Sequence, residues 1–101
     1  MEIFTSFNQI NKSILNYAAK RGIELEIDKE SEAVLFWDAR EDCEWMFSYG
    51  IASRDYTLVW RGNIYLPDEV KEELPAHIMS GEKLKEVINF ISSEFLAKQA
   101  N

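Results

Sequence analysis

Nine carboxylates lie between residues 24 and 44, and only Lys29 and Arg40 balance them. Five of the nine fall in the stretch ELEIDKESE: Glu24, Glu26, Asp28, Glu30 and Glu32. Carboxylates at this density suit three kinds of chemistry: acid and base catalysis by a pair, coordination of a hard cation, and electrostatic binding of a basic partner. Their spacing and their neighbours decide between these.

The neighbouring residues favour neither catalysis nor metal binding. Asp38, Glu41, Asp42 and Glu44 form an acidic loop, but its spacing differs from that of an EF-hand loop and the central glycine is missing. The one histidine, His77, lies in PAHIMSG without a nearby cysteine or a His-Glu-x-x-His pattern. We therefore predict no catalytic residue, no metal site and no cofactor. An enzyme that uses carboxylates alone stays open as a third alternative.

Composition limits the class of protein. With 101 residues, of which 47% are hydrophobic, the chain can bury one core, so we expect a single domain over residues 1–101. A formal charge of -7 repels nucleic acid and anionic membranes as direct ligands, so a protein partner is expected to be basic.

The single cysteine, Cys43, excludes an internal disulfide and is expected to be a small apolar residue. The N-terminal stretch lacks the pattern of a signal peptide, and no segment has the run of about 20 apolar residues that spans a membrane. We expect a soluble, cytoplasmic protein.

Helical periodicity marks the two ends of the chain. Apolar residues recur at steps of four and three from Ile3 to Tyr17, which predicts a helix over about residues 6–21. Ser6 with Gln9 fits a capping box at its start, and Gly22 fits the residue after its end. Pro67 is expected to open a short helix that Pro75 stops. Ser80 is expected to cap a final helix that runs to about residue 98.

A period of two marks the middle of the chain as strands. Residues 23–28 alternate apolar and acidic, and residues 33–37 are apolar on both faces, as in a central strand. Aromatic alternation predicts strands over residues 45–50 and 55–60, a reversal at residues 61–63, and a short fifth strand at residues 64–66. Short connections require mainly antiparallel pairing. We predict a two-layer α+β domain: an N-terminal helix, a four- or five-stranded antiparallel sheet, a short helix, and a C-terminal helix packed on one sheet face.

One face of this sheet is expected to be free of helices. It carries Glu24, Glu26, Asp28, Met46, Ser48, Thr57 and Val59 if the alternating apolar residues lie under the helices. The second strand adds either Val34 and Phe36 or Leu35 and Trp37, and the pattern leaves this choice open. Apolar surface beside a polar rim typically marks an interface, although an ordinary solvated face explains the same residues. The candidate partner-binding residues are Glu24, Glu26, Asp28, Glu30, Glu32, Phe36, Met46 and Val59.

Two functions fit these residues. The first is a small acidic, non-catalytic protein-binding module, an adaptor or chaperone that holds a basic protein or forms a homodimer through the open sheet face. In element order and acidity the chain resembles the type III secretion chaperones, although it lacks their central helix. The alternative is an acidic inhibitor that mimics nucleic acid, as immunity proteins and phage-encoded DNA mimics do. Alternate strand residues lie about 6.6 Å apart, close to the phosphate spacing along one strand.

Overall fold

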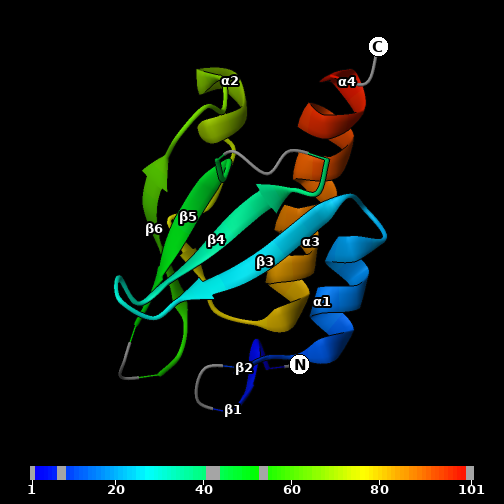
Figure 1. Ribbon diagram of the computed structural model, residues 1–101. Helices are drawn as coiled ribbons and strands as arrows, with labels where there is room; N and C mark the ends of the chain where they lie inside the picture. The colour runs from blue at the N-terminus through cyan, green and yellow to red at the C-terminus, as the bar shows by residue number, and fades with distance from the viewer. Residues whose placement is uncertain (1, 7–8, 41–43, 53–54, 100–101) are drawn as a thin grey trace.

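The computed structural model describes residues 2–6, 9–40, 44–52 and 55–99. Figure 1 shows its elements, from two short N-terminal strands to a long C-terminal helix. The strands are β1 (Phe4–Ser6), β2 (Gln9–Ile10), β3 (Ile23–Asp28), β4 (Ala33–Asp38), β5 (Phe47–Ile51), β6 (Leu58–Asn63) and β7 (His77–Ile78). The helices are α1 (Lys12–Ala19), α2 (Asp68–Lys71), α3 (Gly81–Ile91), the π-helical turn η1 (Ser92–Leu96) and α4 (Ala97–Gln99). No helix among the described residues is long and apolar enough to cross a membrane.

The described strands form a five-stranded antiparallel sheet in the order β3-β4-β5-β6-β7, and β1 pairs with β2 in a separate hairpin. An α+β domain with an antiparallel sheet and a C-terminal helix is therefore confirmed. The predicted fifth strand at residues 64–66 is wrong: the fifth strand is β7, which pairs Leu58 with Ile78. The predicted reversal at residues 61–63 is also wrong, because these residues continue β6.

The first helix begins six residues later than the sequence pattern predicts. Asn11 caps α1, since its side-chain oxygen accepts a hydrogen bond from the Ser13 N–H at 3.0 Å. Ser6 and Gln9 do contact each other, with the Ser6 hydroxyl donating to Gln9 Oε1 at 3.1 Å, but they belong to the β1–β2 hairpin. The apolar residues of this segment recur as in a helix because the hairpin also packs against the core. Ile10, for example, is buried.

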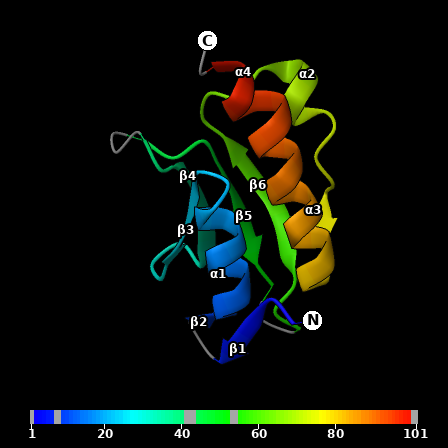
Figure 2. The same ribbon diagram turned by 90° about the vertical axis from the view of Figure 1, so that its right-hand side faces the viewer.

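The two longer helices, α1 and α3, lie side by side on the same side of the sheet, as Figure 2 shows. Arg21 joins them: its Nε donates to Asn89 Oδ1 at 3.3 Å, and its backbone carbonyl accepts from the Ser92 hydroxyl at 3.1 Å. Gly22 follows with a φ of 79°, which glycine adopts without strain. Ser80 caps α3 by accepting from the Lys83 N–H, as predicted.

The register settles which face of β4 packs against the helices. Val34 pairs with Tyr49 and Phe36 with Phe47, and all four side chains are fully buried in the core cluster. The Phe36 and Phe47 rings stack with centroids 4.4 Å apart. Leu35 and Trp37 therefore lie on the opposite face, which we call the open face. Phe36, a candidate for partner binding, is a core residue.

Met46 is fully buried in the core as well, so its expected place on the open face is wrong. The predicted strand begins at residue 45, but β5 begins at Phe47, and Met46 lies in a bend before it. Its N–H donates to the Phe36 carbonyl at 2.7 Å, and its own carbonyl accepts from the Ile64 N–H at 2.9 Å. Side-chain alternation holds only within the regular pleat, so it does not place a residue in such a bend.

Candidate functional site

The acidic residues of ELEIDKESE follow β3 and its turn to β4. Glu24 and Glu26 are exposed on the open face, where they lie opposite Trp37 and Leu35 of β4. Glu30 and Glu32 are exposed in the turn, as the sequence predicts. We call these four residues the acidic face.

Asp28 has a different position and a structural part to play. It is half-buried, and its carboxylate accepts hydrogen bonds from the Glu30 N–H at 3.2 Å and from the Ser31 hydroxyl at 2.8 Å. An aspartate that binds the backbone two residues on is a common way to stabilise a turn. Asp28 therefore stabilises the turn that carries Glu30 and Glu32. Its carboxylate already accepts hydrogen bonds within the chain, so it is less available to a partner.

The acidic face has no cationic partner among the described residues. The described salt bridges join Arg40 to Asp38, Lys83 to Glu86 and Lys98 to Glu94, all outside it. Within the described part of the chain, the side chains of the acidic face accept one hydrogen bond, from the Trp37 indole to Glu26. The exposed charge at Glu24, Glu30 and Glu32 is thus available to an external cation.

Arg61 sets the inner boundary of this negative charge. The register passes from Ser48–Gly62 to Tyr49–Trp60, so Arg61 is the extra residue of a β-bulge. Its guanidinium lies over Gly50, where a Cβ atom would stand only 2.7 Å from Nη2, and Nη1 donates to the Ser31 carbonyl. Negative charge therefore lies along β3, and positive charge crosses the middle of the open face.

The backbone of β3 has one free edge, because β3 is the outermost strand. The Ala39 N–H donates to the Gly22 carbonyl at 2.9 Å, and in an antiparallel pair such bonded positions recur at every second residue. Glu24, Glu26 and Asp28 consequently exchange backbone bonds with β4. The N–H and C=O groups of Leu25 and Ile27 point away from it, and no described residue bonds to them.

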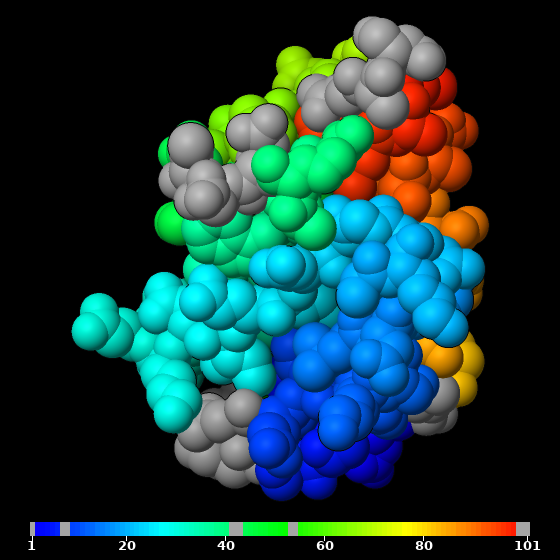
Figure 3. All heavy atoms as spheres, turned by 45° about the vertical axis from the view of Figure 1, so that its right-hand side comes forward, coloured from blue at the N-terminus to red at the C-terminus, as the bar shows by residue number. Residues whose placement is uncertain are grey.

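A groove runs beside this free edge, between β3, α1 and the N-terminal hairpin. Its volume is about 580 Å³, and its apolar walls are Ile10, Leu15, Leu25 and Ile27. The polar residues that line it are Thr5, Gln9, Lys12 and Lys29. Figure 3 shows α1 (blue) and β3 (light blue to cyan) next to each other on this side of the molecule. We call this the β3 groove.

The structure divides the predicted site residues. Glu24, Glu26, Glu30 and Glu32 form one surface, whereas Phe36 and Met46 are buried in the core. Val59 is 37% exposed on the open face, but it lies on β6, opposite His77 of β7.

Leu25 and Ile27 were expected under the helices, and both are only half-buried because the groove leaves them accessible. The signal in the sequence was their place in the first strand of a meander, which is normally an edge strand.

Asp38, the last residue of β4, forms an ion pair with Arg40. Asp38 is buried, and its two oxygens accept from Nε and Nη2 of Arg40, each at 3.2 Å. Burial by itself raises the pKa of Asp38, but the hydrogen bonds and the charge of Arg40 outweigh it and lower that pKa. Residues 41–43, including Cys43, lie outside the described residues. Over the described part of the chain, no group of three or more histidine, cysteine and carboxylate side chains is placed to hold a metal ion.

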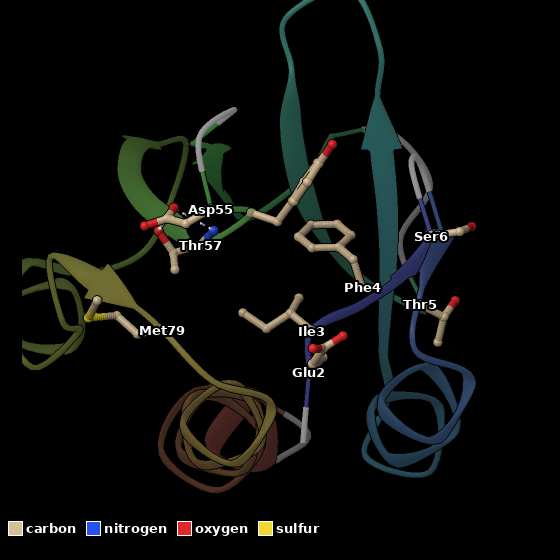
Figure 4. Close-up of a pocket in the computed structure, with 9 residues that line it drawn as sticks. Glu2, Ile3, Phe4, Thr5, Ser6, Asp55, Thr57 and Met79 are labelled. Carbon is tan, nitrogen blue, oxygen red and sulfur yellow. Dashed lines mark hydrogen bonds between the residues drawn. The ribbon is translucent and has the colours of Figure 1, made fainter.

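A second hollow, of about 430 Å³, lies at the hairpin end of the sheet. Figure 4 shows Ile3 and Phe4 in its middle, with Asp55 and Thr57 on one wall and Met79 beyond them. The Asp55 carboxylate accepts from the Thr57 hydroxyl at 2.9 Å, so it serves the local turn. Phe4 contacts the Tyr56 ring, with centroids 6.0 Å apart. This hollow has mixed walls and brings together no set of groups with a recognisable chemistry.

No family model matches this chain, and no curated protein or solved structure shows a significant similarity to it.

Proposed function

We propose that this protein is a small, non-catalytic binding module that holds a basic protein partner through the acidic face. The observation that carries the proposal is the exposure of Glu24, Glu26, Glu30 and Glu32 without a cationic partner in the described chain. Four carboxylates on neighbouring positions, without a cationic partner among the described residues, produce a local negative potential that attracts a positively charged surface.

Charge also argues against a homodimer through the same face. Two copies related by a two-fold axis near β3 would bring Glu24 and Glu26 of one copy close to Glu24 and Glu26 of the other, and like charges across an interface cost free energy. The net charge of -7 adds to this repulsion. A heterologous basic partner therefore fits the open face better than a second copy does.

The test compares three tagged proteins in a pull-down from lysate: the unmodified chain, Glu24→Lys with Glu26→Lys, and Glu72→Lys with Glu73→Lys. Glu72 and Glu73 are exposed directly after α2, which lies apart from β3 (Figure 1), so this control makes the same change in charge elsewhere. We expect basic proteins to bind the unmodified chain and the control but not the β3 variant. The bound proteins should elute when the salt concentration is raised until the Debye screening length falls below about 8 Å.

Identical proteins on all three baits would overturn the proposal. The nucleic-acid mimic is distinguished in the same experiment by adding an oligonucleotide before elution. Release of the partner by the oligonucleotide would identify a nucleic-acid-binding protein and favour the mimic, in which Glu24 and Glu26 stand about 6.6 Å apart as phosphates do.

A further inference from the structure

Leu25 and Ile27 belong both to the free edge of β3 and to the wall of the β3 groove. Leu25 and Ile27 direct their backbone N–H and C=O groups outward, and their side chains form one wall of the groove. A strand that paired with β3 would satisfy these four backbone groups. Its own side chains on the helix side would enter the groove, against Leu15 and Ile10.

The two faces of such a strand meet opposite environments. On the groove side Ile10, Leu15, Leu25 and Ile27 provide apolar surface, and Lys12 and Lys29, which also line the groove, repel a basic side chain. On the open face the neighbours are Glu24 and Glu26, which attract one. Because side chains alternate along a strand, the chemistry that fits is one apolar residue followed by one basic residue.

We infer that β3 accepts an extended segment of the partner as an additional strand, with apolar side chains in the β3 groove and alternate basic side chains over the acidic face. The inference rests on the proposed function for the charge of the partner, and it adds how the partner binds. The edge of β3 is six residues long, and it has neither a proline nor a bulge, which are two of the usual protections of an edge strand.

A second copy of the chain is a poorer occupant of this edge. Antiparallel pairing of β3 with a second β3 would place Glu26 opposite Glu26 and Glu24 opposite Asp28 if the strands crossed at Glu26, and Glu24 opposite Glu26 if they crossed at Leu25. Like charges directly opposite in a sheet destabilise the pair. The acidic residues therefore select against self-pairing and in favour of a basic strand.

The test uses synthetic octapeptides with capped ends and a fluorescent label, titrated with the full chain in anisotropy experiments. The first peptide alternates lysine and valine, and the second has the same composition as a block of four lysines followed by four valines. We expect the alternating peptide to bind about tenfold more tightly, since only it satisfies both faces at once.

Backbone methylation provides the decisive comparison. In an added strand, alternate residues direct their N–H groups to β3 and the others direct theirs to solvent. N-methylation of the valines and N-methylation of the lysines are therefore expected to differ. One set should weaken binding by about tenfold and the other should leave it nearly unchanged. Equal affinity of both methylated peptides would overturn strand addition.

Two variants of α1 test the groove. Leu15→Lys places a cation in the groove wall, and Asn16→Lys places the same charge on an exposed neighbouring position. We expect only Leu15→Lys to weaken the alternating peptide, and circular dichroism verifies that both variants are folded. Equal effects would contradict the inference.

The outcomes separate the two proposals. If the alternating and block peptides bind equally, and Glu24→Lys with Glu26→Lys abolishes both, strand addition fails and the acidic face stands. If neither peptide binds, both proposals fail. Sedimentation of the free chain as a dimer that the alternating peptide does not dissociate would assign the edge to a second copy and overturn the inference.

Discussion

The indole N–H of Trp37 donates a hydrogen bond to Glu26 Oε1 at 3.0 Å. The register pairs Trp37 with Glu24 and Leu35 with Glu26, so the bond runs diagonally across the outer two strands of the open face. The Trp37 ring is supported in turn by Trp45, with centroids 6.2 Å apart and planes at 68°. One carboxylate of the acidic face is thus held in place by an aromatic side chain that is itself an optical reporter.

Replacing Trp37 with phenylalanine should remove this bond and the reporter together. We expect the free energy of unfolding to fall by about 1 kcal/mol, the usual net value of one hydrogen bond. A basic ligand bound at Glu26 should change the tryptophan emission of the unmodified chain, and Trp37→Phe should lose that change. Trp60→Phe is the control, because Trp60 packs on Phe47 and Tyr49, on the core side of the sheet. An emission change that persists without Trp37 would contradict binding at this position.

Two methionines provide a direct test of the core. Met46 is fully buried and Met79 is 70% exposed. Met46→Ala should lower the free energy of unfolding by about 2–5 kcal/mol, because it removes buried methylene groups and leaves a cavity. Met79→Ala should change it by less than about 0.5 kcal/mol. Urea denaturation measures both, and similar losses in the two variants would show that Met46 is not a core residue.

The elements that local patterns encode were predictable from the sequence. The alternation in IELEID predicts β3 and its exposed acidic residues, and Ser80 before an amphipathic run predicts the start of α3. The exposure of Glu24 and Glu26 follows from the same alternation, and the exposure of Glu30 and Glu32 follows from the turn predicted after this strand. These predictions succeed because each depends only on residues that are close together in the sequence.

Features that depend on pairing could not be predicted in this way. The bulge at Arg61 moves Gly62 to the face of Ser48, and the bend at Met46 places the Met46 side chain in the core, so simple alternation predicts neither position. The β3 groove depends on which strand is outermost and on where α1 begins, and the helix pattern misplaced that start. The outward direction of the Leu25 and Ile27 backbone depends on the register with β4, which is a property of the folded sheet.

Tyr49 ties the centre of the sheet to the segment before β7. Its hydroxyl donates to the Pro75 carbonyl at 2.7 Å, so Tyr49→Phe should cost about 1–2 kcal/mol at neutral pH. Burial raises the pKa of Tyr49 above its ordinary value. A raised pKa contributes stability that is complete below the unfolded pKa of about 10 and is lost as pH rises further, so the gap between the two proteins should narrow there. Tyr17→Phe, whose hydroxyl has no hydrogen-bond partner among the described residues, is the control. A gap that widens above pH 10 would contradict the assignment.

Asp38 should govern part of the acid sensitivity of the fold. Its pKa is lowered in the folded chain, because the hydrogen bonds and charge of Arg40 outweigh the effect of burial. A lowered carboxyl pKa contributes stability that is present above the unfolded value of about 3.9 and is lost as pH falls through the folded value. Asp38→Asn should therefore cost about 1–3 kcal/mol at pH 7, and the difference from the unmodified chain should shrink below about pH 4.

Denaturation by urea at several pH values checks this expectation. Glu86→Gln is the matched control, because Glu86 pairs with Lys83 at 3.8 Å on the exposed side of α3, with 70% of its side chain exposed. Such surface pairs contribute about 0–1 kcal/mol, so this variant should follow the unmodified chain at every pH. A cost of Asp38→Asn that stays constant from neutral to strongly acidic pH would show that the contribution of Asp38 does not depend on its charge. The hydrogen bonds between Asp38 and Arg40 would then stabilise the fold whether or not Asp38 is charged.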